Sequence, residues 1–211
     1  MNKTNYQKEL DKVIMYQKDN VPTLFLHSCC APCSSYVIEY LSNYFNITVF
    51  YYNPNIYPDT EYTFRSSEQK RLISEMKTKY PVNYIDEDYD SNQFYKAVKG
   101  FENEPEGGKR CEKCFELRLE RTAQRACAGG FDYFATTLTI SPLKNAQLIN
   151  DIGNSLAEKY SVKWLPSDFK KKGGYKRSIE LSKIYNLYRQ NYCGCIFSHG
   201  QRPQDIREDS F

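Results

Sequence analysis

The sequence predicts an α/β fold built around a parallel sheet. Short apolar runs, rich in β-branched and aromatic residues, alternate with longer segments of helical periodicity, which is the pattern of repeated strand–helix–strand units. The chain has 211 residues, 40% of them hydrophobic and 26% charged, which suits one globular domain. We therefore expect a single α/β domain over residues 1–211, with a basic C-terminal segment from about 161 to 204.

The first half of the chain contributes a helix and three strand–helix units. The first twenty residues are expected to form a helix that covers a sheet edge, with Leu10, Val13, Ile14 and Tyr16 as its apolar positions. The sheet is expected to begin after Pro22 with an apolar run at 24–27, and β-branched or aromatic strands follow at 47–52 and 81–85. Helical patterns occupy about 36–41, 60–79 and 91–99.

The second half continues the same alternation. A helix-forming run extends from about 109 to 127 and stops at Gly129-Gly130, and strands are predicted at 133–138 and 162–165. Ser141-Pro142 turns into another helix, and a last helix is expected over about 177–189.

The composition narrows the class of protein. No apolar run approaches the ~18 residues typical of a membrane span, and the first residues lack the apolar core of a signal peptide. A cytoplasmic location is therefore expected. Eight cysteines in such a chain favour metal binding or redox chemistry over a disulfide framework.

The first cysteine group follows the first strand directly, in Cys29-Cys30-Ala31-Pro32-Cys33. In an open parallel sheet this loop lies at the carboxyl edge, where ligands bind. The loop has neither Gly-x-Gly-x-x-Gly nor Gly-Lys-Ser/Thr, so a phosphate-binding role is not expected. The thiols indicate a metal site in its place.

The second group, Cys111 and Cys114, stands one helical turn apart near a helix N-terminus that favours thiolates. With Cys29 and Cys30 it would complete a four-thiol site, which either zinc or an iron–sulfur cluster accepts. Adjacent cysteines favour the cluster, because structural zinc usually takes pairs separated by two or more residues. Cys33 is left undecided between an alternate ligand and a reserve thiol.

One further cysteine and both histidines are interpreted as structural residues. Cys127 stands among alanines at a helix end and is expected to be a buried packing residue, while His27 lies in an apolar strand and His199 in a polar tail. None of them is expected to bind a metal.

Positive charge is concentrated near the C-terminus. Residues 161–204 hold nine Lys or Arg against two acids, whereas the whole chain holds 29 against 26. Within this segment, Lys170 to Arg177 forms a basic, glycine-broken stretch around Tyr175. Such a stretch can bind RNA phosphates and stack on bases, although a solvated turn is the alternative.

Further motifs are spread from about Thr23 to Ser198. They are the Cys29-Cys30 loop, 52–56 with Glu61, Tyr62 and Arg65, Arg110 to Cys114 with 117–119, Phe131-Asp132, 136–138, 140–142, 172–178, 188–190 and 192–195. Together they resemble the cobalamin-independent epoxyqueuosine reductases, the QueH family.

The resemblance implies a fold, a reaction and a site. The fold would be Rossmann-like and similar to the adenine nucleotide α-hydrolases (HUP-like). The reaction would remove the epoxide oxygen of epoxyqueuosine at the tRNA wobble position to give queuosine. A 4Fe–4S cluster would be held by Cys29, Cys30, Cys111 and Cys114, without cobalamin. The partners would be tRNA carrying epoxyqueuosine and an external electron donor.

The resemblance also implies a redox-active pair, Cys193 and Cys195. Two thiols separated by one glycine can close into a strained disulfide and release two electrons, which fits a two-electron reduction. A second metal-binding pair is the alternative for these residues. Iron of the cluster is predicted to act as a Lewis acid on the epoxide oxygen.

Two other functions use the same residues. One is a zinc- or cluster-stabilised RNA-binding module without catalysis. The other is an ATP-using tRNA thiolation enzyme, which would share the fold but requires the phosphate loop that this sequence lacks.

Overall fold

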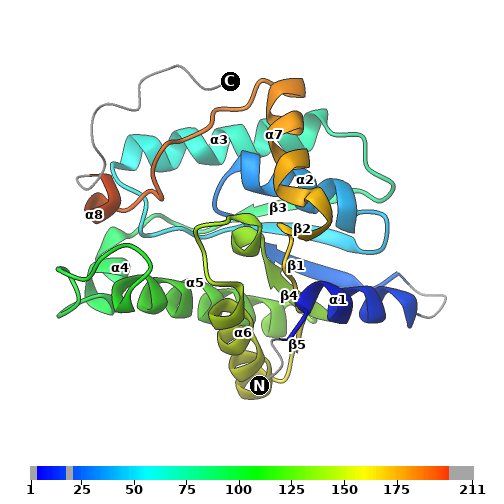
Figure 1. Cartoon of the computed structure of the whole chain (residues 1–211), viewed down its shortest axis with the longest axis horizontal. Helices are drawn as coiled ribbons and strands as arrows, with labels where there is room; N and C mark the ends of the chain where they lie inside the picture. The colour runs from blue at the N-terminus through cyan, green and yellow to red at the C-terminus, as the bar shows by residue number, and fades with distance from the viewer. Residues whose placement is uncertain (1–3, 18–20, 200–211) are drawn as a thin grey trace.

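A five-stranded, all-parallel sheet with the order β3-β2-β1-β4-β5 forms the centre of the computed structural model (Figure 1). The structure describes residues 4–17 and 21–199. The strands are β1 (Thr23–His27), β2 (Asn46–Tyr51), β3 (Val82–Asp86), β4 (Tyr133–Thr136) and β5 (Lys163–Trp164). The predicted parallel α/β class is confirmed, and the likeness to adenine nucleotide α-hydrolases stays a prediction.

Helices cover both faces of the sheet (Figure 1). They are α1 (Tyr6–Met15), α2 (Ala31–Leu41), α3 (Asp59–Glu75), α4 (Ser91–Ala97), α5 (Lys109–Ala128), α6 (Ala146–Tyr160), α7 (Gly174–Ile184) and α8 (Ile196–His199). There are also two short 3₁₀ turns in the described residues, η1 (Thr137–Ile140) after β4 and η2 (Lys171–Gly173) before α7. Among the residues described, no helix is both long enough and apolar enough to cross a membrane.

Alternation along β1 divides the core into two layers. Leu24 and Leu26 pack with residues of α2, whereas Phe25 packs on the other face with residues of α5 and α6. Each fully buried side chain of this size contributes about 1.5–3 kcal/mol. A strand that is apolar on both faces is the expected central strand of a parallel sheet, and its carboxyl end is therefore fixed in position.

The strand order creates a ligand-binding position at the end of β1. The chain leaves β1 toward β2 on one side and returns from β3 to β4 on the other, so the loops after β1 and β4 separate. Ligands of open parallel sheets bind at this point. The Cys29-Cys30 loop occupies it, as the sequence predicted for the carboxyl edge.

Several element boundaries differ from the expectation. Helix α3 ends at Glu75, β4 ends at Thr136, α6 begins only at Ala146, α7 runs from Gly174 to Ile184, and α8 was not predicted. Tyr16, expected on the apolar face of the first helix, is exposed at its C-cap, while Leu10 is fully buried in the core cluster that includes Leu24 and Leu26.

Candidate metal centre

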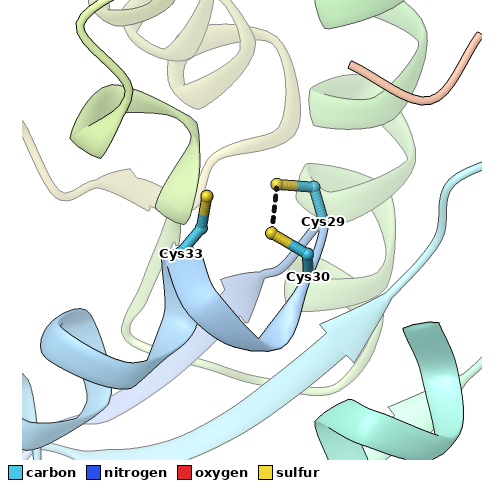
Figure 2. Close-up of side chains that lie close together, drawn as sticks. All are labelled: Cys29, Cys30 and Cys33. Carbon is cyan, nitrogen blue, oxygen red and sulfur yellow. Dashed lines mark hydrogen bonds between the residues drawn. The ribbon is translucent and has the colours of Figure 1, made fainter. Parts of the chain in front are cut away.

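Three cysteines meet at the start of α2. The Sγ atoms of Cys29, Cys30 and Cys33 lie within 4.8 Å of one another, and those of Cys29 and Cys30 are 3.9 Å apart. Figure 2 shows the three side chains on the loop after β1 and the first turn of α2. The structure thus places Cys33, which the sequence left undecided, beside the two predicted ligands.

Hydrogen bonds within this group favour a thiolate at Cys29. Hydrogen bonds from the Cys30 and Cys33 thiols lower the pKa of Cys29 well below its usual value, despite burial. The same hydrogen bond to Cys29 raises the pKa of Cys30 to about 11. A thiolate supported by neighbouring thiols is the form in which cysteine binds metals.

The second pair lies in the first two turns of α5. The backbone N–H of Gly107 donates to Cys111 Sγ at 3.2 Å, as the predicted helix N-terminus allows. Burial raises the pKa of Cys111, and it raises that of Cys114 to about 12. Among the described residues, the group around Cys29 is the only set of three or more potential ligands with such close spacing, so the predicted four-thiol set is not closed here.

The cysteine pair near the C-terminus lies between the two groups. A cavity of about 10 Å³ is lined by Cys111, Cys114, Cys193 and Cys195. Cys193 also lines a larger cavity of about 260 Å³ with Cys29 and Cys33. Seven of the eight cysteines therefore gather at one end of the sheet, although their sequence positions span more than 160 residues.

Arg118 connects the cysteine groups. Its guanidinium is 2% exposed, with Nε donating to the Cys114 carbonyl (3.3 Å) and Nη1 donating to Asn53 Oδ1 (3.3 Å). Asn53 in turn donates to the Ser28 carbonyl at 2.8 Å, next to Cys29. Burial lowers the pKa of Arg118, but the surrounding cysteines, Cys114 foremost, raise it overall.

Two more arginines are buried nearby. Arg110 lines the small cavity with Arg118, and Arg65 donates from Nη1 to the Cys193 carbonyl at 3.4 Å. Among the described residues, Arg65 Nη2, Arg110 Nε and Nη2, and Arg118 Nη2 are buried without a hydrogen-bond partner. Arg65 is paired with Glu61 at 2.7 Å, whereas Arg110 and Arg118 have no carboxylate partner among the described residues. Buried guanidinium groups without such a partner are stabilised by another anion nearby. A metal centre with several thiolate ligands carries such a negative charge, so these residues fit one.

Gly194 shapes the loop between Cys193 and Cys195. Its φ of +122° lies in a region that side chains rarely adopt, and its carbonyl accepts a hydrogen bond from Tyr57 N at 2.8 Å. Cys195 Sγ lies 3.5 Å from the Ser198 hydroxyl in α8. The loop is therefore anchored, with both sulfurs facing cavities that the other cysteines line.

Residues of the C-terminal segment also line the cavity of about 260 Å³. Beside its cysteines it is lined by Lys144, Tyr175, Arg189, Tyr192 and neighbouring polar residues. Burial lowers the pKa of Lys144, but Cys193, Cys29 and Cys33 together raise it overall. The cavity thus combines thiols, two cations and two aromatic rings.

Much of the predicted basic patch is internally paired. Lys170 binds Asp168 (2.5 Å), Lys172 binds Asp11 (2.6 Å), and Arg177 binds Glu39 (2.8 Å). Lys171 and Lys176 have no carboxylate partner among the residues described. Residues 200–204 of the predicted basic segment lie outside the described residues. The segment is therefore less positive than its local sequence indicates.

The structural interpretations of the remaining residues are partly confirmed. His27 is fully buried, its Nε2 donating to the Tyr52 carbonyl and its Nδ1 facing Thr136 Oγ1, and burial lowers its pKa to about 3. The ring of His199 packs edge-on against Tyr192. The expectation for Cys127 is wrong, because this residue is exposed at the end of α5.

Sequence reasoning did not assign a role to Arg118 or Lys144. Arg118 follows Cys111 and Cys114 at helical spacing, so the shared helix face was the available signal. Lys144 carried no comparable signal, because it stands in an irregular loop before α6.

Comparison with known proteins identifies the family. The family model described as "Epoxyqueuosine reductase QueH" matches residues 24–201. Proteins named epoxyqueuosine reductase QueH from Staphylococcus epidermidis and Streptococcus pyogenes are each 46% identical, covering 98% and 97% of this chain and 89% and 82% of their own lengths. The protein of that name from Thermotoga maritima is 38% identical over 89% of this chain and 96% of its own. This chain belongs to the QueH family.

Proposed function

We propose that this chain is an epoxyqueuosine reductase, which converts epoxyqueuosine at the tRNA wobble position into queuosine. The observation that carries the proposal is the family match over residues 24–201, within which the seven gathered cysteines lie. The proposed substrate places the reaction in the cytoplasm. A zinc-stabilised binding module and a thiolation enzyme are not favoured, because the matching relatives are named as reductases.

The proposed cofactor is a 4Fe–4S cluster with Cys29, Cys30, Cys111 and Cys114 as ligands. Support comes from the two thiol groups on either side of Arg118 and from the unpaired guanidinium N–H groups around them. A bound cluster of this type supplies single electrons and Lewis-acidic iron.

Cys193 and Cys195 are the proposed two-electron source. Removing the epoxide oxygen consumes two electrons and two protons and yields an alkene and water. Oxidising two thiols to one disulfide releases two electrons and two protons, so the exchange balances, and an external reductant then reopens the disulfide. Cys193 and Cys195 are free cysteines in the structure.

The cavity of about 260 Å³ that Cys29, Cys33 and Cys193 line is the proposed position of the wobble base. Tyr175 and Tyr192 also line it and offer faces on which a base can stack. A base bound in this cavity would lie beside Cys193.

The direct test is an assay on isolated tRNA. Anaerobically purified protein, a strong reductant and tRNA carrying epoxyqueuosine should yield queuosine, measured by mass spectrometry of the digested nucleosides. Cys193→Ser should stop repeated turnover, and Cys127→Ser, at the exposed cysteine, should behave as the unmodified protein. Unchanged epoxyqueuosine with an intact, iron-loaded protein would contradict the proposal.

A further inference from the structure

A second cavity adjoins the proposed wobble-base cavity. Its volume is about 520 Å³, within the range of small-molecule sites. Pro142, Leu143 and Lys144 line both cavities, so this three-residue ridge is the wall between them. Leu143, at the middle of the ridge, is 67% exposed. Neither the cysteines nor the proposed reaction uses the second cavity.

The charged groups of this cavity favour an anion. Lys170 and Lys171 line it with Lys144. The one acid in its lining, Asp168, is neutralised by Lys170 at 2.5 Å. Lys171 is exposed and, within residues 4–17 and 21–199, has no carboxylate partner. The cavity therefore presents a net positive charge to solvent.

Two helix starts add to this field. Asn5 and Asn145, the N-caps of α1 and α6, both line the cavity. Tyr6 at the start of α1 contacts Asp151 and Gln147 of α6, which holds the two helix ends together. The positive ends of both helix dipoles thus lie beside the lysines.

We propose that this cavity binds the nucleotide that adjoins the wobble nucleotide in the same RNA, with its phosphate against Lys171. The inference rests on the proposed function, because it takes the first cavity as the site of the wobble base. Leu143 then lies between the two bases, where an apolar side chain can separate them and direct the wobble base toward the thiols.

The shared ridge favours an RNA nucleotide over a free one. Two cavities on either side of three residues suit two units of one chain, and a phosphodiester that crosses the ridge meets Lys144 and Lys171. A free phosphate would use the lysines alone and would leave the rest of a 520 Å³ cavity without an occupant.

The first measurement is RNA affinity as a function of salt. Lys171→Ala should weaken binding of an epoxyqueuosine-containing anticodon stem-loop by roughly fivefold and reduce the slope of log affinity against log salt by about 1. Lys183→Ala is the matched control, since Lys183 is also exposed in the basic segment but lines neither cavity. Equal effects of the two substitutions would overturn the inference in favour of general charge attraction.

The second measurement locates the phosphate. Stem-loops with one neutral methylphosphonate linkage, placed either before or after the wobble nucleotide, are compared with the unmodified RNA. At one of the two positions, the methylphosphonate should weaken binding to the unmodified protein but not to the Lys171→Ala protein. In the variant the contact between Lys171 and that phosphate is already lost, so neutralising the phosphate removes nothing more. The inference would be overturned if the methylphosphonate and Lys171→Ala weakened binding additively at both positions. It would also be overturned if inorganic phosphate bound in a Lys171-dependent way while the two RNA positions showed no dependence on Lys171.

These outcomes are separate from the test of the reaction. If the unmodified protein binds the stem-loop but does not reduce it, the proposed function fails whatever Lys171 does. If it reduces the stem-loop and the Lys171→Ala protein binds with unchanged affinity and salt slope, only the second cavity is misassigned.

Discussion

At the scale of single residues, Arg118 links the two cysteine groups by hydrogen bonds. It is buried, it binds the backbone at Cys114, and through Asn53 it reaches the loop that carries Cys29. A buried cation next to thiolates favours every added electron, because reduction makes a cluster more negative. Its charge should therefore affect electron transfer as well as stability.

Replacing Arg118 tests that charge. Arg118→Met should shift the midpoint potential of the cluster to more negative values, and Arg118→Lys should shift it less, because the charge is kept. The potential is measured by redox titration with electron paramagnetic resonance. Arg125→Met, at an exposed arginine of the same helix, is the control. An unchanged potential in an iron-loaded Arg118→Met protein would show that this charge does not act on the cluster.

The Cys-Gly-Cys loop gives a second prediction at this scale. Cys193→Ser and Cys195→Ser should each keep the full iron content but lose repeated turnover, because a single thiol cannot form the disulfide that supplies two electrons. Iron content and product per chain are measured on the same sample. Loss of iron from either variant would make the pair a set of metal ligands.

Single residues also mark the limits of sequence reasoning. The Cys29-Cys30 and Cys111-x-x-Cys114 motifs could be recognised from the sequence alone. The carboxylates that pair with the basic patch could not. Asp11 and Glu39, which bind Lys172 and Arg177, stand more than 130 positions away from them. Charge counted along a segment therefore overstates the charge that the folded surface presents.

At the scale of elements, strand and helix types were predictable and their ends were not. Thr137 and Leu138 were expected to continue the strand 133–138, but the strand ends at Thr136, whose side chain accepts a hydrogen bond from Leu138 N and caps a 3₁₀ turn. Similarly, the last helix was expected to begin only at about residue 177. Gly173 instead takes a positive φ and Gly174 starts α7, which packs closely on α2.

Gly174 should tolerate no side chain. A Cβ there would stand 2.0 Å from the Phe169 carbonyl oxygen and 2.4 Å from the Tyr36 ring. Gly174→Ala should lower the free energy of unfolding by about 1–3 kcal/mol, measured by urea denaturation. Lys176→Ala on the exposed side of α7 should change it by less than about 0.5 kcal/mol. Equal stability of the two variants would mean that α7 can move away from α2 at little cost.

For the whole molecule, the class was predictable and the meeting of distant segments was not. Alternating strands and helices predict a parallel sheet, and the apolar run of β1 predicts a central strand. The sequence contains no local signal that the loop carrying Cys193 returns to lie between Cys29 and Cys111, because this depends on the packing of α7 against α2. Because this loop returns, the Cys29-Cys30, Cys111-x-x-Cys114 and Cys193-Gly194-Cys195 motifs lie at one site.

The most direct measurement is the metal content of the anaerobically purified protein and of two cysteine variants. The account predicts about four iron atoms and four sulfides per chain, a brown colour, loss of both in Cys111→Ala, and retention in Cys33→Ala. Cys33 lies closer to Cys29 than the second pair does, so this comparison separates the proposed ligands from a merely adjacent thiol. A colourless, zinc-containing protein, or full iron and sulfide in Cys111→Ala, would contradict the proposed centre.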